Sequence, residues 1–264
     1  MSTAAENDTN NAKSMKSSSG PRSKVAAWSL WLALAAAIVL ALAGPLFRMD
    51  LTSLFTSFGI LRFTPIAAIG IVLIALAGIA EARVLKDGKG TLMALGAIVV
   101  CAVVIAMPLN QRMKARGVPP IHDITTDTQD PPAFVDVLPL RKDAANPADY
   151  EKDGGAKIAA AQAAAYPDIK PLELSVSPSD AFDKALAVAK KMGWDIVAES
   201  KTDGRIEATD TTFWFGFKDD IVIRVREAAG GSRVDIRSES RIGLSDIGVN
   251  AKRVRAFLAA MQSA

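Results

Sequence analysis

Three long apolar segments fill most of the N-terminal part of the chain. They cover about residues 25–43, 63–81 and 91–109. The first contains no charged residue, and the second has the shortest uninterrupted apolar run, residues 66–80. A helix needs about 20 apolar residues to cross the hydrocarbon core of a bilayer. The pattern therefore predicts a transmembrane region of three helices over residues 25–109.

Residues 1–24 are polar and rich in Ser, Asn and Ala. Such a segment buries too little apolar surface to offset its ordering entropy, so it is predicted to be a disordered tail. The first apolar segment has an alternative interpretation as a cleaved signal peptide, because small residues end it. Two further apolar segments follow, however, and they favour a membrane-spanning helix.

After the third apolar segment the chain becomes polar and rich in proline. A strap of residues 117–148 contains Pro119-Pro120, Pro131-Pro132 and Pro139, with many Asp and Thr residues. Proline lacks a backbone donor and favours extended geometry, which predicts a non-helical course. An Ala-rich helix over residues 156–165 follows the strap. Residues 110–170 are therefore predicted to connect the membrane region to a C-terminal domain.

Strand and helix periodicities alternate from Leu172 to the end of the chain. Strands are predicted at 172–176, 195–200, 205–212, 220–227 and 233–242, and helices at 178–192 and 246–262. The pair Ser177-Pro178 followed by Asp180 is typical of a helix start, and Gly193 is typical of a helix end. The order β-α-β-β-β-β-α predicts an α+β domain over residues 171–264, with two helices on one face of an antiparallel sheet.

One face of the last two strands carries alternating charges. Because side chains alternate along a strand, the apolar and small residues share one face and the charged residues share the other. The binding candidates on the charged face are Arg224, Arg226, Arg237 and Arg241. Two interpretations remain open. The face is either solvated and laced with cross-strand ion pairs, or a platform on which arginines bind an anionic lipid headgroup or an acidic partner.

Four aromatic residues crowd into the five positions from 213 to 217, at the end of a predicted strand. The contact candidates here are Trp214, Phe215 and Phe217. Neighbouring residues cannot all face one core, so some are expected to be exposed toward the bilayer, a ligand or another protein. The alternative is burial against the strap, where Phe134 and Leu138 need partners.

Charge and residue counts exclude several classes of protein. Half of the 264 residues are hydrophobic, and the mean hydropathy is +0.22. Residues 1–109 have nine Lys and Arg against five Asp and Glu, whereas residues 110–264 have 22 against 23. The C-terminal part therefore lacks the dense basic surface that nucleic acid requires. One Cys and one His exclude a zinc finger, a disulfide scaffold and a haem-attachment motif.

His122 is the only histidine, with Asp123 beside it and Asp127 four positions after Asp123. This pattern could supply an acid–base pair, or part of a metal site completed by Asp130 or Asp210. The simpler interpretation is a set of turn residues, because Asp and Thr side chains hydrogen-bond their own backbone in such segments. That interpretation is preferred, and no metal and no cofactor are expected.

Four motifs occur in order within residues 115–262. They are Ile121–Asp127 (IHDITTD), Tyr166–Ile169 (YPDI), Gly204–Asp220 (GRIEATDTTFWFGFKDD) and Gly231–Ala251 (GSRVDIRSESRIGLSDIGVNA). Together they resemble the bacterial and plastid domain-of-unknown-function family numbered 1499. The three-helix membrane region is similar to that of many bacterial members. The resemblance implies no particular biochemical activity. By pattern alone, residues 178–209 also resemble the helix-grip domains of envelope lipoproteins.

Two functions remain open at this point. The first is a non-catalytic envelope protein whose C-terminal domain binds a partner protein or a lipid-like ligand. The second is a membrane-tethered enzyme that uses His122, Asp123 and Asp127. The scarcity of catalytic residue types favours the first. The expected location is the bacterial inner membrane, and the Lys and Arg residues around the spans favour a cytoplasmic N-terminus, which places the C-terminal domain in the periplasm.

Overall fold

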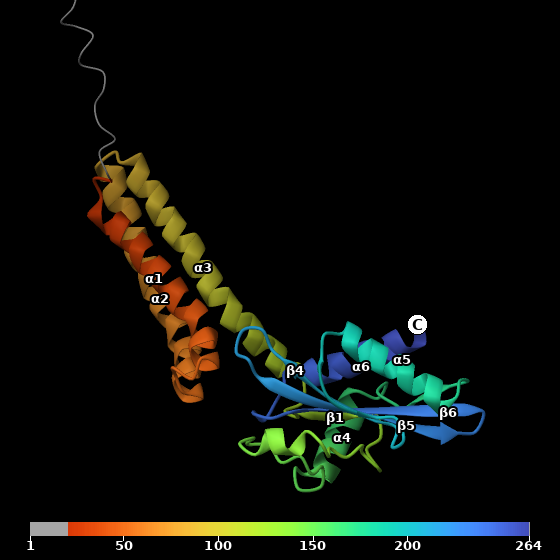
Figure 1. The fold of residues 1–264 in the computed structure, drawn as a ribbon. Coiled ribbons are helices and arrows are strands. Elements are labelled where there is room, and N and C mark those ends of the chain that lie inside the picture. The colour runs from red at the N-terminus through yellow and green to blue at the C-terminus, as the bar shows by residue number, and fades with distance from the viewer. Residues whose placement is uncertain (1–20, 264) are drawn as a thin grey trace, which may run out of the picture. The chain divides into compact units, whose positions relative to one another are not determined.

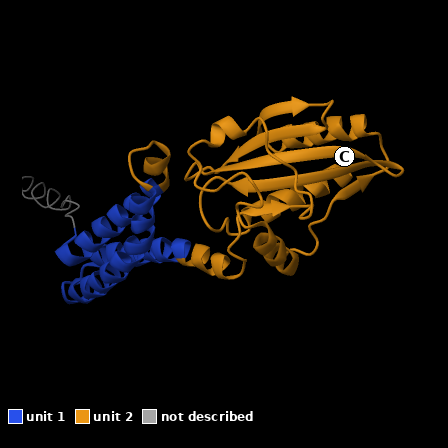
Figure 2. Cartoon of the chain, turned by 90° about the horizontal axis from the view of Figure 1, so that it is seen from below, with its two compact units in different colours: residues 1–43, 54–108 blue, residues 44–53, 109–264 orange. Residues whose placement is uncertain are grey.

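The structure, a computed structural model, describes residues 21–263. The chain divides into two compact units, shown in blue and orange in Figure 2. The first contains residues 54–108 and the described residues up to 43, and the second contains residues 44–53 and 109–263. The predicted disordered tail lies almost wholly outside the described residues.

Three apolar helices follow one another along the first part of the chain (Figure 1). They are α1 (Lys24–Arg48), α2 (Leu54–Val84) and α3 (Gly88–Arg116). Each is long and apolar enough to cross a membrane. All three extend beyond the predicted segments, and α2 begins at Leu54, well before its predicted start at residue 63. The segment predicted to be the shortest span therefore belongs to the longest helix.

Small residues line the contacts between the membrane helices. Ala26, Ala75 and Ala97 are fully buried inside the first unit. Gly78 allows the closest approach, because a Cβ atom at this position would lie only 2.8 Å from the backbone of Ala26. In lipid, helices associate through close packing and polar contacts rather than through the hydrophobic effect, which explains this composition.

The second unit contains a six-stranded antiparallel sheet and its helices. The strands are β1 (Asp123–Thr125), β2 (Leu172–Leu174), β3 (Asp195–Ser200), β4 (Arg205–Thr211), β5 (Lys218–Ala228) and β6 (Gly231–Ser240). The helices are the 3-10 helix η1 (Leu138–Arg141), α4 (Gly155–Ala165), α5 (Pro178–Lys191) and α6 (Val249–Ser263). The predicted order β-α-β-β-β-β-α is confirmed from β2 to α6.

The strand order is β1-β6-β5-β4-β3, and β2 pairs with β6 on the same side as β1. Strand β1 was not predicted. It lies within the strap and pairs Asp123 with Glu239. The Gln162 side chain of α4 accepts a hydrogen bond from the Thr125 amide and donates one to the Thr125 carbonyl. The Gln162 side chain thus hydrogen-bonds the backbone amide and carbonyl that this edge strand would otherwise leave unpaired.

Helices α5 and α6 lie together on one face of the sheet (Figure 1). The side chains of Ile221, Ile223 and Ile236 point from the sheet into this core and are fully buried. Ser177 caps α5, since its hydroxyl accepts a hydrogen bond from the Asp180 amide. Gly193 follows the helix with a φ of +79°, a left-handed conformation that favours glycine.

The strap covers the opposite face of the sheet. Phe134 and Val137 of the strap pack against Val222 of β5. The carboxylate of Glu207 accepts hydrogen bonds from the Val135 and Val137 amides at 2.9 and 2.8 Å. The interpretation of the charged face as solvated is therefore wrong for most of its length, because proline-rich chain from another part of the sequence buries it.

Candidate functional site

Buried ion pairs connect the strap to the charged face of the sheet. Arg237 on β6 is only 2% exposed and pairs with Asp123 on β1 at 2.7 Å. Arg141 in η1 contacts both Asp220 and Glu239, with 2.6 Å between the Arg141 Nη1 and an Asp220 oxygen. Each arginine in this group therefore contacts at least one carboxyl group, as a buried cation requires.

The charged face continues to a more open end. Arg224, Arg226 and Arg233 surround the carboxylates of three aspartates there. These aspartates are Asp127, Asp130 and Asp235. Arg233 lies 2.6 Å from Asp127, and Arg226 lies 2.9 Å from Asp130. The positive charges are thus matched by carboxylates of the same domain.

The four predicted arginine candidates are all placed on this face, and all are paired internally. Arg224 and Arg226 share Asp130 and Asp235. Arg237 pairs with Asp123, and Arg241 approaches Asp220 to 2.8 Å. The guanidinium groups that were predicted to bind an anionic headgroup or an acidic partner therefore already contact carboxylates.

The three catalytic candidates have different partners. The Nε2 atom of His122 lies 2.9 Å from a carboxylate oxygen of Asp153. Asp123 pairs with Arg237, and Asp127 pairs with Arg233. Asp127 also accepts hydrogen bonds from the amides of residues 129 and 130, as a turn residue does. The described residues contain no group of three or more His, Cys, Asp or Glu side chains placed to hold a metal ion.

Burial and ion pairing shift several pKa values in this group. Burial raises the pKa of Asp123, although Arg237 opposes the rise. Burial also raises the pKa of Glu239, to about 9, and the charge of Asp123 adds to the shift. Burial alone lowers the pKa of His122, but Asp153, the Leu244 carbonyl and Asp123 together outweigh burial, so that the pKa lies above its ordinary value. Asp123 and Glu239 therefore hold their protons more tightly than exposed carboxyl groups do.

A strap hollow opens where the strap leaves the sheet. It has a volume of about 510 Å³, and its lining includes Pro131, Phe134, Leu138, Pro147, Tyr150 and Arg237. The guanidinium carbon of Arg237 lies 4.8 Å from the centre of the Phe134 ring and 5.4 Å from that of the Tyr150 ring. The hollow therefore combines apolar walls with a cation held against two aromatic rings.

Tyr150 is the least satisfied polar residue of the strap hollow. The residue is 6% exposed, and its buried hydroxyl has no hydrogen-bond partner within residues 21–263. Burial raises the pKa of this hydroxyl, so it stays protonated at neutral pH. An unpaired buried hydroxyl costs free energy, and a bound molecule or a water is the usual explanation in a native protein.

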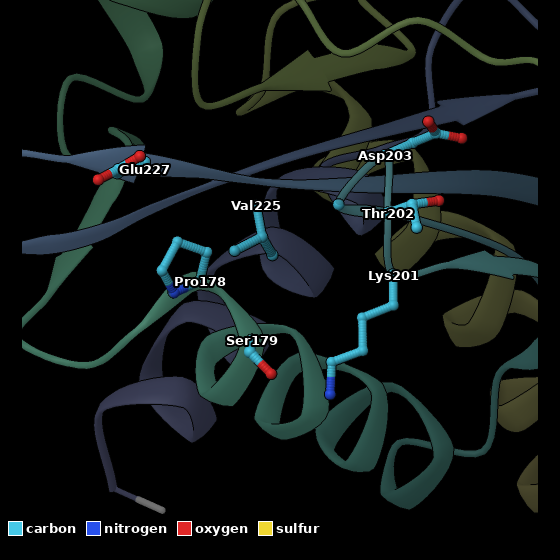
Figure 3. A pocket seen from close by; sticks show the side chains of 8 residues that line it. Pro178, Ser179, Lys201, Thr202, Asp203, Val225 and Glu227 are labelled. Atoms are coloured by element: carbon cyan, nitrogen blue, oxygen red, sulfur yellow. The ribbon is translucent and has the colours of Figure 1, made fainter.

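A second hollow of about 570 Å³ lies at the start of α5 (Figure 3). Pro178 and Ser179 border it on one side, and the turn from Lys201 to Gly204 borders it on the other. The Lys201 amino group is paired with Asp183 at 2.6 Å. Among the described residues that line this hollow, no buried side-chain nitrogen or oxygen lacks a partner. This hollow therefore has no unpaired buried polar group that a ligand would satisfy, whereas the strap hollow has the Tyr150 hydroxyl.

The aromatic segment is divided between buried and exposed positions. Phe215 is buried, with its ring stacked on that of Phe217 at 4.9 Å and tilted against Phe47 at 5.9 Å. Trp214 packs edge-on against Phe215 and is partly exposed. Phe213 is 91% exposed. The partner of the buried rings is Phe47, and the strap residue Phe134 packs elsewhere.

Several residues of these sites were not predicted from the sequence. Asp153 follows the strap and pairs with His122, and Arg141 joins two sheet carboxylates. Tyr150 has the unpaired hydroxyl. Phe213 is the most exposed of the four aromatic residues, although the prediction singled out the other three. Only the tight spacing of charges in Arg233–Arg241 signalled a paired face in advance.

The fold and the sites define a class of protein. Three membrane-type helices precede an α+β domain whose charged sheet face is closed by a strap. The family model described as "Protein of unknown function (DUF1499)" matches residues 123–261, and the chain belongs to this family. No curated protein and no solved structure matches the chain. The match begins at β1 and ends in α6, so the strap, the sheet and its helices form the family's shared part.

Proposed function

We propose that the chain is a membrane-anchored protein of the bacterial envelope whose C-terminal domain binds a lipid-like ligand in the strap hollow without catalysing a reaction. The observation that carries this proposal is the chemistry of the hollow. Proline, aliphatic and aromatic side chains form one part of its lining, and Arg237 and Tyr150 contribute polar groups beside them. The charged residues Asp149, Glu151 and Lys152 complete the lining. Sites for small ligands combine mostly apolar walls with a few polar groups in this way.

The size of the hollow fits a small ligand. Its volume of about 510 Å³ falls within the range of roughly 300–1,000 Å³ that is usual for such sites. A ligand seated there removes the apolar surfaces of Pro131, Leu138 and Pro147 from water. Since Arg237 is already paired with Asp123, a ligand with an uncharged hydrogen-bonding head suits the site better than a strongly anionic one.

The arrangement of the catalytic candidates supports a non-catalytic role. An acid–base mechanism needs groups within hydrogen-bond reach of one substrate. His122, Asp123 and Asp127 instead contact three different partners, and none of them lines either hollow. The alternative function, an enzyme built on these three residues, therefore has less support.

The membrane anchor supports a location in the inner membrane with the domain in the periplasm. Three helices are long and apolar enough to span, and an odd number of spans leaves the two ends of the chain on opposite sides of the bilayer. A lipid-like ligand is plentiful near such an anchor.

Filling the hollow tests the proposal. Ala133 is exposed and lines the strap hollow, so Ala133→Trp places an indole there without disturbing the core. Ala145 is an exposed alanine of the same strap outside the lining, and Ala145→Trp is the matched control. The full chain and both variants are purified in mild detergent. The molecules that remain bound are extracted with organic solvent and identified by mass spectrometry.

We expect the unchanged chain and Ala145→Trp to retain the same lipid-like molecule in a defined ratio to protein. Ala133→Trp should lose most of it. Equal retention by both variants, or no retained molecule at all, contradicts a ligand site in the hollow. A co-purifying protein that is lost from Ala133→Trp but kept by Ala145→Trp favours a partner protein instead.

A further inference from the structure

Two loops at one end of the sheet expose large apolar side chains. Phe213, in the loop from β4 to β5, is 91% exposed, and Leu244, between β6 and α6, is 83% exposed. The two loops start side by side, because the Arg241 amide donates a hydrogen bond to the Lys218 carbonyl. Two large apolar groups left in water at neighbouring places indicate a contact that the isolated chain does not show.

The exposure of Phe213 does not come from a loose loop. In the same loop, the rings of Phe215 and Phe217 stack on each other, and the Thr212 hydroxyl accepts a hydrogen bond from the Phe217 amide at 2.9 Å. Gly216 turns the chain with a φ of +69°, where a side chain would be strained. A packed loop base thus holds one phenyl ring outward.

The same end of the sheet receives the chain from the apolar helices. Only residues 117–122 separate the end of α3 from β1, and a segment of this length spans at most about 20 Å. The Asp246 amide donates to the Ile121 carbonyl, so the loop that carries Leu244 lies beside this short connection. Both loops and the connection therefore lie at one end of the second unit.

Residues at the end of α1 also reach this end of the sheet. Within the second unit, the Phe47 ring lies 5.6 Å from the Phe217 ring, and the Arg48 guanidinium donates to the Phe213 carbonyl at 3.0 Å. Phe47 and Arg48 end an apolar helix long enough to cross a membrane. Aromatic and basic residues at such a position are typical of the membrane–water interface.

We propose that Phe213 and Leu244 insert into the interfacial region of the bilayer that holds the three helices. The partner of these two side chains is the lipid surface. Arg48, which donates to the Phe213 carbonyl, and the exposed Lys218, where the same loop ends, supply positive charge for the lipid headgroups. The α+β domain then rests on the membrane by its loop end, with the turn at Lys201–Gly204 at the far end of the sheet. This contact is separate from the strap hollow and does not depend on a ligand there.

Environment-sensitive labels test this contact in the full chain. Cys101 is the only cysteine, so a Cys101→Ala background allows single labels. Phe213→Cys and Leu244→Cys place a nitrobenzoxadiazole label at the loop end. Thr202→Cys places it on the exposed turn at the other end of the sheet, as the matched control. Each protein is reconstituted into phosphatidylcholine nanodiscs, with or without doxyl-labelled lipid.

The labels at positions 213 and 244 should emit at shorter wavelength than the label at position 202. Doxyl lipid should reduce their emission at least twofold and leave position 202 unchanged. All three substituted side chains are exposed, and an unchanged thermal melt confirms that the variants fold. Emission at 213 and 244 equal to that at 202 overturns the proposal. A short-wavelength emission that doxyl lipid does not quench also overturns it, because the label is then buried against protein.

Discussion

Ion-paired aspartates of the α+β domain are expected to contribute very differently to its stability. Asp220 is fully buried and accepts hydrogen bonds from Arg141, Arg241 and Thr209. Burial alone would raise its pKa, but these hydrogen bonds and the arginine charges outweigh burial and lower the pKa, so Asp220 is ionised at neutral pH. Asp183, in contrast, forms an exposed pair with Lys201. The two aspartates therefore provide a matched comparison.

We expect Asp220→Asn to destabilise the domain by about 3–5 kcal/mol, because two arginines lose the charge that offsets their burial. Asp183→Asn should cost less than about 1 kcal/mol, since water screens the exposed pair. Urea unfolding of the full chain in mild detergent, followed by circular dichroism, measures both changes. Similar losses in the two variants would show that the buried network does not stabilise the domain.

His122 is the residue whose charge responds to pH near neutrality. Burial disfavours the protonated ring, but Asp153, the Leu244 carbonyl and Asp123 together favour it more strongly, so the pKa is raised above the ordinary value. The stability that the pair provides is therefore fully present below the pKa of the unfolded chain, about 6.5, and is lost as the pH rises through the folded pKa.

Because His122 is the only histidine, its titration can be followed without assignment. NMR of histidine-labelled protein in detergent should give a pKa above about 6.5 for the unchanged chain. Asp153→Asn should lower the pKa below about 6.5, since burial then outweighs the remaining effects of the Leu244 carbonyl and Asp123. Asp149→Asn, at an exposed position in the same segment, should leave it unchanged. A pKa that does not respond to Asp153→Asn would contradict the assigned pair.

At the scale of elements, the strap is attached to the sheet largely by polar contacts. Glu207 of β4 accepts hydrogen bonds from the Val135 and Val137 amides, and Arg241 donates to the Leu140 carbonyl. The apolar contact between strap and sheet is small, with Phe134 and Val137 against Val222. Removing a polar attachment should therefore release the strap locally and leave the core of α5 and α6 folded.

Glu207→Ala tests this prediction. Each lost hydrogen bond to a charged acceptor is worth about 1.5–3 kcal/mol, so amide exchange at residues 135–137 should accelerate by roughly 10- to 100-fold. Glu199→Ala, at an exposed position on the neighbouring strand β3, should leave that exchange unchanged. Hydrogen–deuterium exchange with mass spectrometry measures both. Unchanged protection of the strap in Glu207→Ala would show that other contacts hold it.

Elements with a local signal were predictable from the sequence, and those that depend on distant partners were not. Strands β3 to β6 have alternating side chains, and α5 has a capping residue at Ser177, so their bounds were predicted closely. Strand β1 has three buried residues and no alternation, and it exists because the edge of β6 pairs with it.

The candidate site was less predictable for the same reason. The arginines and carboxylates of β6 indicated ion pairs. The cover over them comes from the strap, which lies far earlier in the chain. The partner of His122 is Asp153, on the far side of the strap in the sequence, and no periodicity links the two. Which of four neighbouring aromatic residues stays exposed depends on the packing of Phe47, which a local pattern does not contain.

At the scale of the whole molecule, the number of spans decides on which side of the membrane the α+β domain lies. Three helices are long and apolar enough to cross a membrane. Helix α2, which contains the shortest apolar run of the three, has 31 residues. At about 1.5 Å per residue this length exceeds the hydrocarbon core of roughly 30 Å. An odd number of spans places residues 1–23 and residues 117–264 on opposite sides.

The distribution of basic residues favours a cytoplasmic N-terminus. Residues 1–24 and the segment from Arg83 to Lys89, around the turn from α2 to α3, together contain seven Lys and Arg side chains. These are Lys13, Lys16, Arg22, Lys24, Arg83, Lys86 and Lys89. The other two flanking segments contain five, namely Arg48, Arg62, Arg112, Lys114 and Arg116. Because Lys and Arg are retained on the cytoplasmic side and the first helix usually dominates, we predict that the α+β domain faces the periplasm.

Reporter fusions measure this orientation. Alkaline phosphatase fused after Ala264 should be active, and green fluorescent protein at the same place should stay dark, since the first folds only outside the cytoplasm and the second only inside it. The same reporters inserted at Asp87, between α2 and α3, should give the opposite pattern and serve as the control. A fluorescent C-terminal fusion with a dark fusion at Asp87 would mean that the whole molecule is inverted. Fluorescence at both positions would mean that α3 does not cross the membrane.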